Sequence, residues 1–221
     1  MKQAYEKKVV KFGGSSLASA AQFRKSAAII QAEPARRYVV PSAPGKRFDG
    51  DVKVTDLLLE CFEKSDARQD WHPAFQKIRD RYNEIIRDLE LELSLEQEFA
   101  TIEAALRSGT TRDYVASRGE YLNGIVLAAF TGYPFVDAAE VVFFHENGNY
   151  NTHKTNLVMS ERLLSIENAV IPGFYGNLPN GEIKTFSRGG SDITGAVVAR
   201  AVLADLYENW TDVSGFLMCD P

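Results

Sequence analysis

The sequence has little cysteine and little histidine. Its two cysteines, Cys61 and Cys219, lie far apart and form no metal-binding spacing. This excludes a disulfide scaffold and fits a reduced, cytoplasmic environment. The three histidines share no metal-ligand spacing, and no serine or cysteine stands in a nucleophile-elbow sequence. We therefore expect no protein-bound metal ion.

Long apolar runs and excess positive charge are also missing. The longest apolar stretches, such as residues 125–130, are too short to span a bilayer, and residues 1–6 do not lead into a signal-peptide apolar region. With 25 Lys+Arg against 30 Asp+Glu, the net charge is -5, so no global positive field attracts nucleic acid or anionic lipid. We expect a cytoplasmic protein with no nucleic-acid and no membrane partner.

The composition is that of a folded domain with a substantial core. The 221 residues are 45% hydrophobic and 25% charged, close to the average for globular proteins. A short apolar strand is expected at 8–12, a helix at 19–31 with Ser19 as its N-cap, and a second strand at 38–40. This βαβ pattern favours a parallel sheet with helices packed on it.

The rest of the chain predicts a helical middle followed by renewed strand–helix alternation. Helices are expected from Thr55, which could cap the first of them, at 70–93, at 94–109 with Ser94 and Gln97 as a capping box, at 112–130 and at 193–203. Extended segments are expected between 134 and 144, at 166–173, at 182–186 and at 209–211. No internal repeat or linker is evident, so one α/β domain is the economical interpretation.

The glycine pair of Lys11-Phe12-Gly13-Gly14-Ser15-Ser16 follows the first predicted strand. Two glycines let backbone N–H groups approach a ligand, the following helix N-terminus favours negative charge, and a lysine suits phosphate oxygens. The sequence is neither a Walker A motif nor a dinucleotide-binding glycine pattern. By itself it fits a structural glycine turn equally well.

A second glycine turn, Ser187-Arg188-Gly189-Gly190-Ser191-Asp192, opens another predicted helix. Arg188 could bind a substrate carboxylate through two hydrogen bonds. Asp192 could cap the helix, or it could orient a lysine or a magnesium-bound phosphate. Two anion-friendly turns in one α/β chain favour a phosphate site.

Two further motifs have both a plain and a functional interpretation. Ser117-Arg118-Gly119-Glu120 places a glycine inside a helix, at a cost of about 1 kcal/mol, which suggests close approach by backbone or ligand. Its Glu120 could accept a hydrogen bond from a substrate ammonium, or be a solvated helix charge. Thr211 and Asp212 end a predicted strand, as either an ordinary turn or a nucleotide-binding edge.

Taken together, these motifs resemble the aspartokinases of the amino acid kinase family. Lys11-Phe12-Gly13-Gly14-Ser15-Ser16 is similar to the family's opening motif, with serine replacing a threonine. The resemblance continues, in order along the chain, through 39–43 with an inserted Pro41, 53–56, 117–120, 173–174, 188–192, 210–213, Gly215 and Asp220-Pro221.

The resemblance implies a three-layer αβα sandwich with a mainly parallel central sheet. Residues 1–221 would be the kinase catalytic domain, truncated at its C-terminal end, with a helical substrate-side insertion at about 55–130 and no regulatory ACT domains. The implied activity is ATP-dependent phosphorylation of the side-chain carboxylate of L-aspartate to 4-phospho-L-aspartate, the first step towards lysine, threonine and methionine. Mg²⁺ would be carried with ATP, and the full-length enzyme would be a homo-oligomer.

The resemblance also implies roles for individual residues. Lys11 would contact the transferred phosphoryl group and Asp192 would hold the catalytic lysines. Gly13, Gly14 and Ser15 would face the phosphates, with Thr211 and Asp212 at the nucleotide. Arg188 would clamp the α-carboxylate of aspartate, and Ser42, Thr55, Glu120, Phe174 and Ser191 would complete the substrate pocket. A substrate carboxylate with a pKa of about 4 is already ionised, so no general base is required.

Two alternatives stay open. The chain could be another amino acid kinase, acting on glutamate, acetylglutamate or a nucleotide, or a non-catalytic ligand-binding or assembly module. Full-length aspartokinases continue past the Asp-Pro pair with an arginine, a second lysine and paired ACT domains. We therefore expect weak or absent ATP turnover from these 221 residues.

Overall fold

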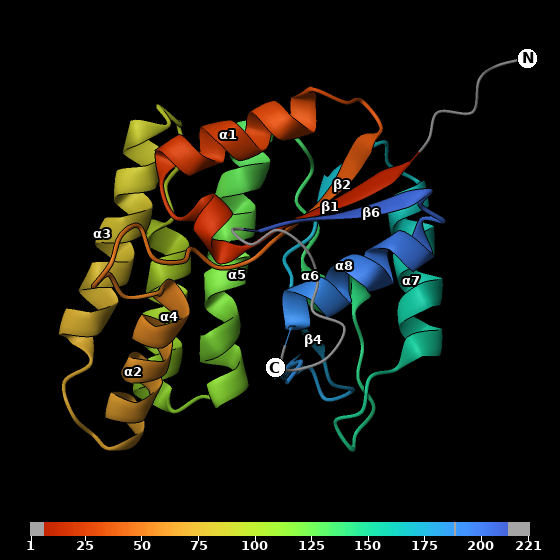
Figure 1. Cartoon of the computed structure of the whole chain (residues 1–221). Coiled ribbons are helices and arrows are strands. Elements are labelled where there is room, and N and C mark those ends of the chain that lie inside the picture. Colours follow the sequence, from red (N-terminus) through yellow and green to blue (C-terminus); the bar gives the residue numbers. More distant parts are fainter. Residues whose placement is uncertain (1–6, 188, 212–221) are drawn as a thin grey trace, which may run out of the picture.

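A four-stranded parallel sheet, in the order β3-β2-β1-β6, forms the middle layer of the protein. The computed structural model describes residues 7–187 and 189–211 (Figure 1). The strands are β1 (Lys8–Phe12), β2 (Arg36–Pro41), β3 (Ala169–Val170) and β6 (Leu206–Trp210). Because β1 lies between β2 and β6, its loop opens at the centre of the sheet.

Side chains alternate between the two faces of the sheet, and each face builds its own core. Val10, Phe12 and Val39 point into a cluster with helices α1 to α5. Val9 and Val40 point into a second cluster with α6, α7 and α8. Figure 1 shows α1 and α5 on one side of the sheet and α7 and α8 on the other. The expected three-layer α/β fold is confirmed.

Helices occupy most of the remaining chain. The helices are η1 (Gly14–Leu17), α1 (Ala20–Gln31), α2 (Val54–Asp66), α3 (His72–Asp88), α4 (Glu96–Ser108), α5 (Arg112–Thr131), α6 (Ala138–Val141), α7 (Thr152–Leu164) and α8 (Gly190–Ala201). A small antiparallel pair is made by β4 (Tyr175–Asn177) and β5 (Ile183–Thr185). In the described part of the chain, no helix combines the length and the apolar character that crossing a membrane requires.

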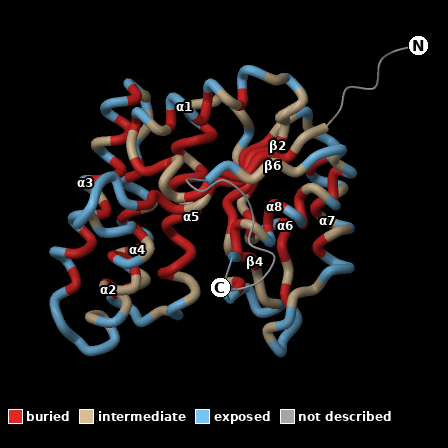
Figure 2. Tube along the Cα trace, viewed as in Figure 1, coloured by how far each residue is buried: buried red, intermediate tan, exposed pale blue. Residues whose placement is uncertain are grey.

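Helix α5 is buried along most of its length, as Figure 2 shows. Two glycines allow this close packing. A methyl group at Gly119 would lie 2.7 Å from the Cβ of Ala43, and one at Gly124 would lie 2.8 Å from the ring of Pro172. The helix glycine noted in the sequence therefore serves close approach of the loop after β2.

The expectation of strands between 134 and 144 was wrong. The segment contains the short helix α6, and Phe135, Phe143 and Phe144 form only isolated bridges. Asp137 caps α6, because its carboxylate accepts a hydrogen bond from the Ala139 N–H at 2.9 Å. Local capping overrides the β propensity of the surrounding residues.

Three predicted helix boundaries also need correction. Helix α2 begins at Val54 with Lys53 as its N-cap, so Thr55 lies in the first turn and caps nothing. The Ser94–Gln97 capping box does not form, since Leu95 is the N-cap of α4. Helix α3 ends at Asp88 instead of near residue 93, because Glu90 takes the left-handed conformation (φ 57°) typical of a helix end.

Candidate functional site

A cleft of about 440 Å³ opens where β1 and β2 end, and we call it the strand-end cleft. Ligands of open α/β sheets bind at this edge, where the carboxyl ends of parallel strands meet. Its lining residues are Lys11, Gly13, Gly14, Ser15, Ser42, Ala43, Pro44, Gly45, Lys46, Lys53, Thr55, Glu120 and Thr211. Eight of these, from five separate segments of the sequence, belong to the predicted site.

Lys11, which lines the cleft, forms an ion pair with Asp192. Lys11 lies in β1, and only 7% of its surface is exposed. Its Nζ lies 2.9 Å from Oδ1 of Asp192. The amide of Asn209 on β6 donates to the same oxygen at 2.9 Å. Helix α8 has Gly189 as its N-cap, so the capping role considered for Asp192 is wrong. The carboxylate instead meets the lysine ammonium.

The glycine turn after β1 packs directly on the loop after β2. The Gly45 N–H donates to the Gly14 carbonyl at 2.8 Å. A methyl group at Gly14 would lie 2.8 Å from the Ala43 carbonyl oxygen, and one at Gly45 would lie 2.7 Å from the Gly14 carbonyl carbon. Both glycines are therefore required for the two loops to share one wall of the cleft.

Glu120 is a buried carboxyl group on α5 that lines the cleft. It is 6% exposed, and within the described chain its Oε2 atom has no hydrogen-bond partner. Burial raises its pKa to about 7, while hydrogen bonding from the Ala43 backbone opposes the rise. The interpretation of Glu120 as a solvated helix charge is therefore wrong. An unpartnered, buried oxygen at a cleft is suited to a ligand that brings a hydrogen-bond donor.

Two hydrogen bonds hold helix α5 against its neighbours, one to the loop after β2 and one to helix α3. The amide of Asn123 donates to the Ser42 carbonyl at 2.6 Å, and the Tyr82 hydroxyl of α3 donates to the Gly119 carbonyl at 2.7 Å. These bonds fix the position of α5, and with it that of Glu120, relative to the loop that carries Ser42.

Phe174 and Ser191 form a second group at the N-terminus of α8. A methyl group at Gly173 would lie 2.6 Å from the Ser191 side chain, so this glycine permits direct backbone contact. Phe174 takes a left-handed conformation (φ 81°), and its N–H donates to the Thr194 hydroxyl at 3.1 Å. Neither Phe174 nor Ser191 lines the strand-end cleft. Asp192, which follows Ser191 in sequence, connects the two groups through Lys11.

The remaining predicted site residues, Arg188 and Asp212, lie outside the described residues, as does the Asp220-Pro221 pair. Conversely, the structure adds cleft residues that the motifs left out or gave no role: Pro44, Gly45 and Lys46 line the cleft, as does Lys53, which opens the 53–56 motif. Lys46 directly follows the loop glycine Gly45 after a parallel strand, and this position could have indicated it as a cleft residue.

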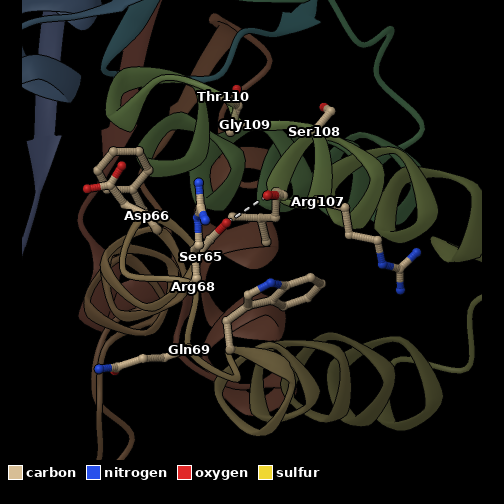
Figure 3. Close-up of a pocket in the computed structure, with 11 residues that line it drawn as sticks. Ser65, Asp66, Arg68, Gln69, Arg107, Ser108, Gly109 and Thr110 are labelled. Atoms are coloured by element: carbon tan, nitrogen blue, oxygen red, sulfur yellow. Dashed lines mark hydrogen bonds between the residues drawn. The ribbon is translucent and has the colours of Figure 1, made fainter.

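A second cavity, of about 530 Å³, lies between the ends of α2 and α4 (Figure 3). Trp71 lines it, and the Ser65 hydroxyl donates to the Leu106 carbonyl at 2.6 Å. The Arg107 guanidinium lies over the Trp71 ring at 5.9 Å. None of the predicted site residues that the structure describes lines this cavity, so the strand-end cleft is the better candidate.

Comparison with known proteins gives three consistent results. Residues 6–221 match the Amino acid kinase family. Aspartokinase 3 of Bacillus subtilis is 38% identical over 228 residues, which cover 97% of this chain and 50% of that protein. The solved aspartate kinase of Clostridium acetobutylicum superimposes with a TM-score of 0.93 at 48% identity, covering 98% of this chain and 50% of that one.

A third relative was solved with ligands. Aspartokinase III of E. coli, in complex with aspartate and ADP, superimposes with a TM-score of 0.80 at 25% identity. The match covers 95% of this chain and 50% of that one. The chain therefore spans about half the length of the relatives it matches.

Proposed function

Since the chain belongs to the amino acid kinase family, we propose that it is an aspartokinase catalytic domain, which transfers a phosphoryl group from ATP to the side-chain carboxylate of L-aspartate. The observation that carries the proposal is the strand-end cleft. It gathers the motif residues, among them the buried Lys11, whose ammonium pairs with the partly exposed carboxylate of Asp192. The relatives are named aspartokinases, and one was solved with aspartate and ADP.

In this proposal Glu120 binds the ammonium of aspartate. Its unpartnered oxygen would accept the hydrogen bond, and the positive charge of the ammonium would lower the Glu120 pKa from about 7. Ser42 and Thr55 would contact the rest of the amino acid from the opposite wall. Arg188 would clamp the α-carboxylate, with Phe174 and Ser191 beside it.

Lys11 and the backbone amides of Gly13, Gly14 and Ser15 would face the phosphoryl group. A carboxylate nucleophile is ionised at neutral pH and needs no base, so the chain supplies alignment and positive charge. Asp192 holds the Lys11 ammonium in place, and Thr211 and Asp212 would contact the nucleotide. Mg²⁺ is commonly held by substrate phosphates and water, so the metal would enter with ATP.

The proposal carries the wider expectations of the resemblance. The product would be 4-phospho-L-aspartate, formed in the cytoplasm and used towards lysine, threonine and methionine. The full-length enzyme would be a homo-oligomer. Glutamate or acetylglutamate kinase activity remains the alternative that the experiment must separate.

The test combines calorimetry with a coupled assay for ADP. We expect the 221-residue chain to bind L-aspartate and Mg-ADP, and to bind L-glutamate and N-acetyl-L-glutamate at least tenfold more weakly. Lys11→Ala should abolish any aspartate-dependent ADP formation, because the phosphoryl group loses its buried cation. It should leave the circular dichroism spectrum unchanged, because Asp192 is partly exposed. Near-normal turnover in folded Lys11→Ala, or a preference for glutamate, would refute the proposal.

A further inference from the structure

Two lysines to which no role was assigned lie at the strand-end cleft. Lys46 and Lys53 are exposed and line it together with Lys11. The three lysines differ in their partners. Lys11 meets the carboxylate of Asp192, whereas neither Lys46 nor Lys53 forms an ion pair with any residue in the described segments 7–187 and 189–211. Their positive charge is therefore available to a ligand.

The loop that carries both lysines is fixed at its two ends by one buried side chain. Arg81 of α3, only 4% exposed, donates to the Gly45 carbonyl at 3.1 Å and to the Val52 carbonyl at 3.4 Å. Lys46 directly follows Gly45, and Lys53 directly follows Val52. Arg81 therefore anchors the backbone immediately before each lysine.

Asp51 completes this anchor. Arg81 donates to both of its carboxylate oxygens, at 2.9 and 2.7 Å, and the Arg47 side chain donates to them at 3.0 and 2.9 Å. Hydrogen bonding from Arg47, together with the charge of Arg81, holds the pKa of Asp51 well below its usual range. The Asp51 carboxylate is thus committed to two arginines and does not pair with the loop lysines, and the other acidic residue of the loop, the exposed Asp49, forms no ion pair with Lys46 or Lys53 in the described structure.

The charge balance of the cleft shows what these lysines can bind. Lys11 is offset by Asp192, which lies outside the lining, and Glu120 contributes a carboxyl group to the lining itself. A nucleotide phosphate chain brings several negative charges, and phosphoryl transfer depends on cations that offset them. L-Aspartate has one net negative charge and an ammonium group that lysines repel. The phosphate chain is therefore the better match.

We propose that Lys46 and Lys53 are phosphate-binding residues, held at the cleft by the Arg81–Asp51 anchor, which contact the phosphate oxygens of the nucleotide. The inference rests on the proposed function only in naming a nucleotide as the ligand; the binding of phosphate groups by the two lysines does not depend on it. Inorganic pyrophosphate is therefore used as a probe alongside Mg-ADP and L-aspartate.

The experiment is calorimetry on the 221-residue chain with Lys46→Met, Lys53→Met and the double variant. Lys77→Met is the matched control, because Lys77 is an exposed lysine on α3 that does not line the cleft. We expect the double variant to bind pyrophosphate and Mg-ADP at least tenfold more weakly and to bind L-aspartate within twofold of the unmodified chain. The control should match the unmodified chain throughout, and since all three lysines are exposed, thermal unfolding should confirm that every variant folds.

The other outcomes separate the two proposals. A double variant that binds both phosphate ligands as tightly as the unmodified chain overturns the inference, as does a loss confined to L-aspartate, which would assign the lysines to the amino acid. An unmodified chain that binds neither phosphate ligand also overturns it. If the unmodified chain binds pyrophosphate through these lysines but binds neither Mg-ADP nor L-aspartate, the inference stands and the proposed function fails.

Discussion

At the scale of single residues, Glu120 shows how burial changes the chemistry of a side chain. The neighbouring Arg118 does not neutralise it by direct contact. The guanidinium of Arg118 bonds the Ser117 hydroxyl and lies over the rings of Tyr114 and Tyr121 at 4.6 and 4.4 Å. Glu120 is thus left with its backbone hydrogen bonds and an unpartnered oxygen. Burial therefore shifts this carboxyl group towards its protonated form, with a pKa of about 7.

This environment predicts how stability depends on pH. The folded-state pKa of Glu120 is raised from 4.5 to about 7, so between these values the unfolded chain loses the proton while the folded chain keeps it. The contribution of Glu120 to the free energy of unfolding should therefore fall as pH rises from about 4.5 to about 7, by a total of about 3 kcal/mol.

Glu120→Gln isolates this effect, because the amide does not titrate and its oxygen can still accept from the Ala43 N–H. Urea unfolding should be measured at pH 5 and at pH 8. The free energy of unfolding of the variant, relative to that of the unmodified chain, should rise by roughly 2–3 kcal/mol from pH 5 to pH 8. An equal pH dependence in both proteins would contradict the raised pKa.

At the scale of elements, the contact between the loops after β1 and β2 depends on two glycines without side chains. Gly14→Ala and Gly45→Ala would each place a methyl group within 3 Å of backbone atoms of the other loop. Because backbone cannot move aside cheaply, we expect each to lower the free energy of unfolding by roughly 1–3 kcal/mol.

Gly13→Ala is the control within the same turn. Its φ of -68° suits any residue, and a methyl group there would meet nothing closer than 3.6 Å. Chemical denaturation should therefore rank Gly13→Ala close to the unmodified chain and the other two well below it. Equal stabilities for the three variants would show that the loops can separate freely.

The sequence predicted elements well where the local pattern is strong. The long amphipathic helices were expected at nearly their observed positions, because apolar spacing alone specifies them. The sequence-based prediction was wrong at 134–144, where a single capping aspartate decides the conformation. It was too long at 166–173, because only Ala169–Val170 pairs with β2 and forms the strand. Strand length there depends on the neighbouring strand, which a local pattern does not contain.

In the candidate site, too, local motifs predicted single residues but not the contacts between distant segments. Motifs identified Lys11 and Asp192 separately, but their pairing depends on two segments 181 positions apart meeting at the sheet. No role was predicted for Lys46 or for Lys53 of the 53–56 motif, since lysines in loops are usually solvated. Only the buried Arg81, supplied by a distant helix, distinguishes this loop from an ordinary one.

At the scale of the whole molecule, one sheet serves two cores. Val9 and Val10 are adjacent and fully buried, yet Val9 belongs to the core with α8 and Val10 to the core with α5. The helices on the two faces are thus joined through the backbone of a single strand. We infer that the two cores unfold as one cooperative unit.

Val9→Ala and Val10→Ala test this inference, each at a cost of roughly 2 kcal/mol. Native-state hydrogen exchange should show faster exchange in both α5 and α8 for either variant, because loss of one core removes the support of the other. Acceleration confined to the helix on the substituted face would mean that the two layers open independently.

The position of β1 between β2 and β6 also sets the timing of folding during synthesis. Lys8 pairs with Arg36 on one side and with Leu206 on the other, so one neighbour is made almost at once and the other 198 residues later. At ribosomal rates, that interval is roughly 10–40 s. During it, the hydrogen-bonding edge of β1 that β6 will cover remains open, as a template for any extended segment. The nascent chain should therefore be most prone to mispairing, and most in need of a chaperone, before residue 210 has left the ribosome.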